Sequence, residues 1–355
     1  MGTFETGRGL ADRLRALPES EREFELLVVT HIDVDHIGGV ISCLVDPATR
    51  VDDVRFKDVW FNGLGHLDGR RIPLPGLVTE LEAFGARQGQ EFSDWLSTQP
   101  WNAHFGRGPV VREGLPVPIT LCGGLRLTVL SPTLTRLAAL KRSWEEDVEI
   151  ALTQQSKDQL AEAPPGLEQW GPTEPPSIED AIDLAALADE RFKPDRKAPN
   201  GSSIVLLVEW CGRRLLLTGD AFASDLVDGL SALEEPGPVR VDLLKLPHHG
   251  SRNNLSKELV AAVECPEWVV SSDGSQFRHP DPQALARILT AGVPSPRTLA
   301  FNVPSEFALW WDNLAWREIG EYDTRYGDTT NGLIYTFEPV VESTNNVLTG
   351  TSSPS

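Results

Sequence analysis

Four side chains that could bind a metal ion lie within six residues near the start of the chain. They form the motif His31-Ile32-Asp33-Val34-Asp35-His36, which Ile37-Gly38-Gly39 follows directly. Imidazole nitrogens and carboxylate oxygens together suit zinc, manganese or iron. A polar, solvated loop is the alternative interpretation, but further clusters of the same kind later in the chain argue against it. The motif therefore predicts a metal site.

Asp220 is the next candidate ligand, and it ends the apolar run Leu215-Leu216-Leu217-Thr218-Gly219-Asp220. A carboxylate at a strand end can bridge two ions through its two oxygens, and the glycine before it allows a sharp turn and a close approach of the backbone. Thr-Gly-Asp alone would indicate a plain turn. Its meaning here comes from the other clusters that accompany it.

Histidines supply the remaining candidates. His248 and His249 follow the strand-like run Val241–Leu246, and His279 follows the strand-like run Trp268–Ser272. Neighbouring side chains on a strand point to opposite faces, so both adjacent histidines could bind one ion only if a turn separated them. We therefore expect one of them to be a ligand and the other a substrate contact. For His279, which has no second histidine beside it, a purely structural role is the alternative to a role in the site.

The elements that must position these residues follow from the hydrophobic pattern. The apolar run Phe24–Thr30 predicts a buried strand that carries the His31 motif at its carboxyl end. A helix is expected to begin near Asp35, where its N-terminal dipole would favour anions over the metals. An amphipathic helix is expected over residues 8–17, with surface helices over 75–100. Further strands are expected at 110–111, 119–121, 125–130, 268–272, 298–301 and 332–337.

Length and composition predict one large domain. The chain has 355 residues, and we expect a single domain over residues 1–340. Residues 138–196 are acidic and rich in proline, which predicts an insertion that is a mobile surface segment, a lid or a partner-docking element. Residues 341–355 are polar and should be disordered. Trp310, Trp311 and Trp316 could stack nucleobases, although packing in the core is the favoured interpretation.

Charge and targeting signals limit the class of protein. The net charge is −20 and the pI about 4.8, which disfavours general adhesion to nucleic acid or anionic membranes without excluding a nuclease. The first twenty residues lack a signal peptide's apolar core, and no run of about 18 apolar residues could cross a membrane. We expect a cytoplasmic protein whose four scattered cysteines are small buried apolar groups.

These motifs, in this order, resemble the metallo-β-lactamase fold family, and within it the hydrolase domain of the ComEC-type DNA-uptake protein and its free-standing relatives. The segments that carry the resemblance are Asn200–Leu207, Leu216–Asp220, Leu244–Ser251 and His279-Pro280. It covers residues 24–45 and 198–340. The resemblance implies an α+β fold, an αββα sandwich of two mixed sheets with a dinuclear metal site at the sheet edge. The family's N-terminal hairpin with its Asp-Gly-Gly turn is expected to be absent here or to precede the assigned start.

The resemblance also implies ligands for two divalent ions, either zinc or manganese. His31 and Asp33 would hold the first ion, while Asp35 and His36 would hold the second. Asp220 would bridge both ions.

Further roles are implied for the remaining histidines. One of the adjacent pair, His248 more readily than His249, would complete the second ion's ligands. The family's third motif supplies a histidine to the first ion, for which His66 is the candidate and His104 the rival. The groups expected to face the substrate are His249, Ser251 and His279.

The chemistry expected of such a site is hydrolysis of a phosphodiester. Two ions roughly 3.5–4 Å apart can clamp the attacking and leaving oxygens and activate water at neutral pH. Asp35 and Asp220 would keep the site anionic, and His249 or His279 could donate a hydrogen bond or a proton to the phosphate or the leaving group. We expect a nuclease of a bacterial defence system that acts with a partner protein and has no membrane attachment. The alternatives are a hydrolase of a small ester or cyclic nucleotide, and a non-catalytic binding module.

Overall fold

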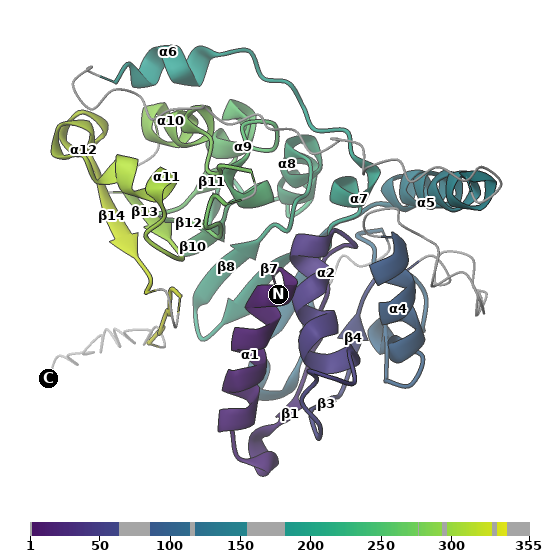
Figure 1. Ribbon diagram of the computed structural model, residues 1–355. Helices are drawn as coiled ribbons and strands as arrows, with labels where there is room; N and C mark the ends of the chain where they lie inside the picture. The colour runs from purple at the N-terminus through teal and green to yellow at the C-terminus, as the bar shows by residue number, and fades with distance from the viewer. Residues whose placement is uncertain are drawn as a thin grey trace, which may run out of the picture.

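A mixed sheet lies at the centre of the molecule (Figure 1). The computed structural model describes residues 2–63, 86–113, 118–154, 182–275, 277–292, 297–328 and 332–338. Within these residues the sheet has eight strands, in the order β14-β13-β12-β10-β8-β7-β6-β5. Their bounds are β5 (Ile119–Thr120), β6 (Arg126–Ser131), β7 (Val205–Trp210), β8 (Arg213–Leu217), β10 (Leu243–Lys245), β12 (Glu267–Val270), β13 (Arg297–Phe301) and β14 (Tyr322–Tyr326). The strands from β8 to β14 pair in parallel, whereas β5, β6, β7 and β8 pair antiparallel.

A row of buried side chains crosses the sheet and explains its order. Successive register partners on five neighbouring strands form this row, and each is at most 1% exposed: Leu207, Leu216, Leu244, Trp268 and Leu299. Full burial of such a side chain stabilises the fold by roughly 1.5–3 kcal/mol. Because β8 and β10 are parallel and in register, their carboxyl ends meet at one edge of the sheet. That edge receives the residues that follow Leu217 and Lys245.

Helices cover one face of the sheet, and Figure 1 shows α6, α8, α9 and α10 together there. The helices of the second half are α5 (Leu134–Gln154), α6 (Leu184–Asp189), α7 (Ala198–Gly201), α8 (Ala223–Ser231), α9 (Lys257–Ala261), α10 (Pro282–Thr290), α11 (Glu306–Leu309) and α12 (Leu314–Gly320). Four of them begin with a side chain that accepts a hydrogen bond from the first turn: Asp183, Ser256, Ser305 and Asn313. A short ladder of β9 (Val239–Arg240) and β11 (Val263–Glu264) links α8 and α9.

The N-terminal part lies on the opposite side of the sheet in Figure 1. It contains α1 (Phe4–Ala16), α2 (Val34–Val40), the π-helical turn η2 (Ile41–Val45) and α4 (Ala86–Leu96). Two parallel ladders pair β1 (Glu23–Phe24) with β3 (Arg55–Phe56), and β2 (Leu27–Val28) with β4 (Val59–Trp60). A Cβ on Gly7 would lie 2.5 Å from the carbonyl oxygen of Gly39, so a glycine is needed where α1 crosses α2. The Ile204 N–H donates to the Thr30 carbonyl at 3.0 Å, which joins the end of the β2 segment to the main sheet.

Most predicted elements are confirmed. The structure contains the first helix, the helix after Asp33 and the strands near 119–121, 125–130, 268–272 and 298–301. It also has short 3₁₀ segments, which are η1 (Glu19–Glu21), η3 (Ala103–Phe105), η4 (Cys122–Gly124), η5 (Pro247–Gly250) and η6 (Trp310–Asp312). The packing role of the tryptophans is also confirmed, since Trp311 and Trp316 are buried and contact each other edge to face. Residues 341–355, and 155–181 of the expected insertion, lie outside the described residues.

Three predictions were wrong. Residues 332–337 form no strand beyond one bridge between Asp328 and Gly332, and the last strand of the sheet is β14. Residues 110–111 form no strand, because the side chain of Asn62 takes both backbone hydrogen bonds of Val110. Cys122 and Cys211 are exposed rather than buried, because both lie in turns between strands. Among the described residues, no helix is long and apolar enough to cross a membrane.

Candidate metal centre

Three strand ends deliver the predicted ligands to one edge of the sheet. The His31 motif follows β2, Asp220 follows β8, and His248 and His249 follow β10. Backbone and side-chain hydrogen bonds hold these loops together: the His248 N–H donates to the Gly219 carbonyl at 3.1 Å, and the Asp220 N–H donates to Ser203 Oγ at 3.0 Å. Asp220 is 1% exposed and lies at the centre of the assembly.

Four ligand atoms meet on one side of Asp220, in a group that we call the His36 cluster: Asp35, His36, Asp220 and His249. The Nε2 atom of His36 lies 3.1 Å from Asp220 Oδ1 and 3.2 Å from the Nε2 atom of His249. The Nε2 atom of His249 lies 3.0 Å from Asp35 Oδ2. All four ligand atoms lie within 4.8 Å of one another, and each comes from a different side chain.

A second group surrounds the other carboxylate oxygen of Asp220, and we call it the His31 cluster: His31, Asp33, His248 and Asp220. The Nε2 atoms of His31 and His248 each lie 3.8 Å from Asp220 Oδ2, and His31 Nε2 lies 3.8 Å from Asp33 Oδ2. These separations are too long for hydrogen bonds. His31 Nε2 is fully buried and has no hydrogen-bond partner among the described residues.

The two clusters fit a pair of divalent ions. Ligand atoms on one tetrahedral zinc ion, with bonds of about 2.0–2.2 Å, stand about 3.4 Å apart. The separations of 3.0–4.0 Å within the clusters are centred on that value. A buried imidazole nitrogen without a partner is costly unless something else satisfies it. Mixed imidazole and carboxylate ligands suit zinc or manganese, as the sequence predicts.

Every histidine of the two clusters presents Nε2 to the centre because its Nδ1 atom is occupied elsewhere. His31 and His36 place Nδ1 3.1 and 3.2 Å from the hydroxyl of Thr30. His249 Nδ1 donates to the carbonyl of Ser271 at 2.5 Å. His248 Nδ1 donates to Asn254 Oδ1 at 2.9 Å. Such outer partners fix the orientation and tautomer of a metal-binding imidazole.

The adjacent histidines do not follow the strand geometry that the sequence predicts. Both lie in η5 with left-handed backbone angles, at φ 47° for His248 and 56° for His249. This turn directs both side chains toward Asp220, whereas an extended strand would separate them. His249 therefore stands in the His36 cluster, at the position where we expected His248, and His248 stands in the His31 cluster.

Outer residues that the sequence analysis did not single out support this arrangement. Asn254 is fully buried and its amide donates to the Asp195 carboxylate at 3.1 Å and to the backbone carbonyls of Asp220 at 3.1 Å and Ala221 at 3.3 Å. Asp195 also accepts from Asn200 at 2.6 Å and lies 3.6 Å from His248 Nδ1. Their only sequence signal is proximity to the motifs, since both belong to loops next to them.

Burial and mutual charge set the protonation of the carboxyl groups. Burial, together with Asp35 and Asp220, raises the pKa of Asp33 to about 7. Burial would also raise the pKa of Asp220, but the surrounding histidines hold it well below its usual range. Asp195 behaves alike: the hydrogen bonds from His248 and its other partners outweigh burial and lower its pKa to about 2.

Burial and neighbouring charges also shift the pKa values of the histidines, in opposite directions for His31 and His248. Burial and neighbouring histidines lower the pKa of His31 well below its usual value, so its ring is neutral at pH 7. Burial would lower the pKa of His248 too, but the carboxylates of Asp220 and Asp195 raise it to about 9. In the metal-free protein His248 therefore carries the proton that a metal ion would displace.

Lys245 is a further charged group at the centre. Its ammonium donates to the Gly219 carbonyl at 3.2 Å and lies 3.7 Å from Asp220 Oδ1. Burial lowers its pKa, although Asp220 and Asp35 oppose that shift. Lys245 thus ties the end of β10 to the turn that presents Asp220.

The remaining predicted residues lie around the centre or away from it. The ring of His279 is 5.6 Å from that of His248, and its Nδ1 atom is buried 3.6 Å from Asp281 Oδ2. Ser251 accepts from the Asn253 N–H at 3.2 Å, within the turn after η5. His104 is bound to Asp58 at 3.1 Å and contacts Trp60, so no described contact joins it to the centre. His66 lies outside the described residues.

Comparison with known proteins gives one partial relative. The chain is 29% identical over 107 residues to ComE operon protein 3 of Bacillus subtilis (strain 168). The matched segment is 30% of this chain and 13% of that protein, so the chain corresponds to only a small part of its relative. No family model matches the chain.

Proposed function

We propose that this chain is a metal-dependent phosphodiesterase of the metallo-β-lactamase fold that cleaves nucleic acid with two divalent ions. The resemblance of its motifs to the hydrolase domain of ComEC-type proteins supports the proposal, as does the partial similarity to ComE operon protein 3. The mixed sheet, with the ligands of the two clusters on loops at one edge, is compatible with that fold.

One observation carries the proposal. Asp220 lies between the two clusters: its Oδ1 atom is 3.1 Å from the Nε2 atom of His36, and its Oδ2 atom is 3.8 Å from the Nε2 atoms of the other three histidines, His31, His248 and His249. Four imidazole Nε2 atoms converge on this carboxylate, and the buried one of His31 lacks a hydrogen-bond partner among the described residues. A structural ion pair would need neither two clusters nor an unsatisfied nitrogen.

The roles of the protein groups follow from their positions. Two divalent ions held in the clusters would supply Lewis-acid activation of water and neutralise charge that develops on a phosphoryl group. Asp35, Asp33 and Asp220 supply the negative charge that holds these ions in place. His279 lies beside His248 without belonging to either cluster, so it is placed to donate a hydrogen bond to a phosphate oxygen or to the leaving group.

Cleavage of end-labelled single-stranded DNA with added Mn²⁺ tests the proposal. We expect the wild type to cleave and Asp220→Ala to lose activity by about a thousandfold or more, because one carboxylate serves both clusters. Metal analysis provides the second readout, and Asp220→Ala should retain its fold while losing bound ions. Asp228→Ala is the matched control, since Asp228 is an exposed aspartate of α8. Failure of the metal-loaded wild type to cleave DNA or RNA would refute the nuclease assignment.

A further inference from the structure

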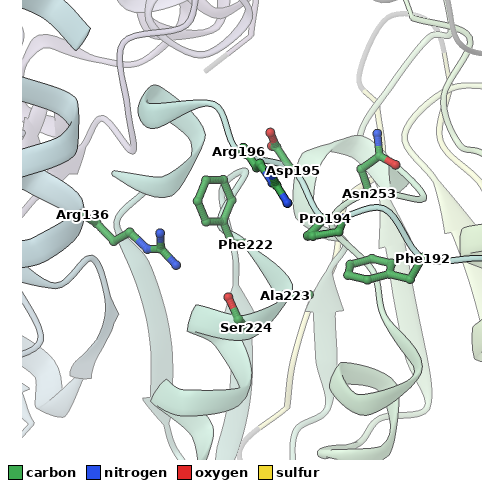
Figure 2. A pocket seen from close by; sticks show the side chains of 9 residues that line it. All are labelled: Arg136, Phe192, Pro194, Asp195, Arg196, Phe222, Ala223, Ser224 and Asn253. Atoms are coloured by element: carbon green, nitrogen blue, oxygen red, sulfur yellow. The ribbon is translucent and has the colours of Figure 1, made fainter. Parts of the chain in front are cut away.

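A cavity of about 300 Å³ lies beside the metal centre and is not accounted for by the proposed chemistry. Figure 2 shows its lining, which comes from α5, from the loop before α7, from the start of α8 and from the turn after η5. The lining residues are Arg136, Phe192, Pro194, Asp195, Arg196, Phe222, Ala223, Ser224 and Asn253. Its volume is at the lower end of the range for small-molecule sites.

Two phenyl rings of the cavity are held in place by guanidinium groups. Arg136 lies over the ring of Phe222, with 4.7 Å between its Cζ atom and the ring centroid, and forms two hydrogen bonds to Asp225 at 2.7 and 2.8 Å. Arg287 lies 5.3 Å over the ring of Phe192. Each ring is thereby fixed from one face. Figure 2 shows Arg196 beside Phe222, with Pro194 and then Phe192 farther along the cavity.

The loop that forms one wall of the cavity is strongly basic, in contrast to the chain as a whole. Its sequence is Arg191-Phe192-Lys193-Pro194-Asp195-Arg196-Lys197, and all four basic residues are exposed. The side chain of Arg196 has no hydrogen-bond or ion-pair partner among the residues that the structure describes. Its neighbour Asp195 is engaged with Asn200, Asn254 and His248, so that carboxylate does not neutralise Arg196 by pairing with it.

The same loop connects the cavity to the metal centre. Asp195 lies in the cavity wall and also beside His248 of the His31 cluster. The backbone N–H of Lys197 donates to Asp195 Oδ1 at 2.9 Å, so the same carboxylate also fixes the chain at Lys197. On the β8 side, Asp220 belongs to the His36 cluster, and Phe222, two residues later, lines the cavity. The cavity and the centre are therefore neighbours on one continuous wall.

We propose that this cavity binds the nucleotide next to the scissile phosphodiester, with its base against the half-buried ring of Phe192 and its phosphate on Arg196 and Lys197. This inference rests on the proposed nuclease function and names a subsite for that substrate. Aromatic faces stack on any nucleobase, and a neighbouring cation binds the backbone phosphate, so the subsite fits single-stranded nucleic acid without a fixed sequence. Duplex DNA keeps its bases stacked inside and would not present one to the cavity.

The test compares the full-length, Mn²⁺-loaded protein on two oligonucleotides of equal length. One is oligodeoxythymidylate, and the other has the same backbone with abasic residues. Base stacking predicts that KM is lower for the base-bearing strand by about 5- to 100-fold. In Phe192→Leu, which keeps an apolar side chain but removes the aromatic face, the ratio of the two KM values should fall toward one. Phe192→Tyr should restore the ratio.

The phosphate contact has its own readout. Arg196→Ala should raise KM for both strands and reduce the slope of log(kcat/KM) against log salt by about one, as expected for the loss of one phosphate contact. Arg8→Ala removes another exposed arginine, on α1, and should change neither the KM ratio nor the slope. Equal thermal unfolding midpoints would show that each variant is folded.

The outcomes separate this inference from the function on which it rests. If the wild type cleaves but does not distinguish the two strands, or if Phe192→Leu keeps the full ratio, the subsite is refuted while the nuclease function stands. If the metal-loaded wild type cleaves neither strand, both are refuted. A lower KM ratio in Phe192→Leu together with a lower salt slope in Arg196→Ala supports the subsite.

Discussion

Substitution of Asn254 tests whether the outer hydrogen bonds of the centre determine its affinity for metal. The buried amide of Asn254 makes four contacts: with His248, Asp195 and the backbone carbonyls of Asp220 and Ala221. In Asn254→Ala, the two carbonyls, the Asp195 carboxylate and the Nδ1 atom of His248 lose this partner. At roughly 1 kcal/mol for each lost contact, the free energy of unfolding should fall by about 2–4 kcal/mol. For a chain of this length that corresponds to a decrease of about 3–5 °C in Tm.

Metal affinity should fall by more than stability alone explains. Loss of the acceptor for His248 Nδ1 frees the ring to rotate or change tautomer, and removal of such an outer partner typically weakens metal binding by about 10- to 100-fold. The assay is competition for Mn²⁺ or Zn²⁺ with a chromophoric chelator, alongside thermal unfolding of the metal-free protein. Asn254→Asp keeps an acceptor for His248, so it should recover much of the affinity while remaining destabilised next to Asp195.

A control separates instability from metal binding. Asn313 caps α12 with hydrogen bonds at 3.0 and 3.3 Å and lies outside the metal centre. Asn313→Ala should lower the free energy of unfolding by about 1 kcal/mol without changing the metal affinity. If Asn254→Ala loses stability yet binds metal as tightly as the wild type, the proposed control of His248 is refuted.

Two further predictions concern pH and thiol chemistry. Because the pKa of Asp33 is raised to about 7 and that of His248 to about 9, both are protonated at about pH 6, so ions should leave the His31 cluster first as the pH falls. Metal analysis after dialysis should find about two ions per chain near pH 9 and one near pH 6. Equal contents at the two pH values would contradict the assignment. Iodoacetamide should label the exposed thiols of Cys122 and Cys211 in the native protein. Labelling of Cys43 and Cys265 should need denaturant, because both are buried and burial raises their pKa values to about 11 and about 12. Mass spectrometry of the labelled peptides checks this.

The residues at the metal centre could be predicted because strand-end motifs are local in sequence. The apolar run before His31 and the run before Asp220 each show where a strand ends and which side chains follow it. The ends of these strands meet because β8 pairs in parallel with β10 and because Ile204 hydrogen-bonds to Thr30. No single segment of the sequence encodes these long-range contacts. The resemblance to a family supplied this long-range part.

Outer residues could not be predicted in the same way. Asp195 and Asn254 are far apart in sequence, and each would suit a surface loop when considered alone. Their role arises because the loop before α7 and the turn after η5 pack together and bury both side chains against His248. The placement of His249 escaped prediction because a left-handed turn of two non-glycine residues is uncommon.

The last strand shows how pairing overrides intrinsic preference. Residues 332–337 are rich in strand-forming types, but this segment joins no ladder and packs through its side chains, with Tyr335 donating to Glu267 at 2.6 Å. The edge strand at this end is β14, whose burial alternates along the strand because Tyr322 packs on Trp311 while Asp323 and Arg325 are exposed. A strand at the edge of a sheet needs only one buried face, so its sequence is less apolar than that of a central strand.

The net charge of −20 is compatible with a nucleic-acid substrate because the charge near the centre differs from the average. At physiological salt the Debye length is about 8 Å, so distant acidic groups are largely screened from a bound phosphate. The carboxylates at the centre would be neutralised by the ions that they hold, and the loop next to it contributes four cations between Arg191 and Lys197. Under the proposed function, the acidic exterior would limit adhesion to duplex or bulk nucleic acid, and the basic loop would attract a single strand to the candidate centre.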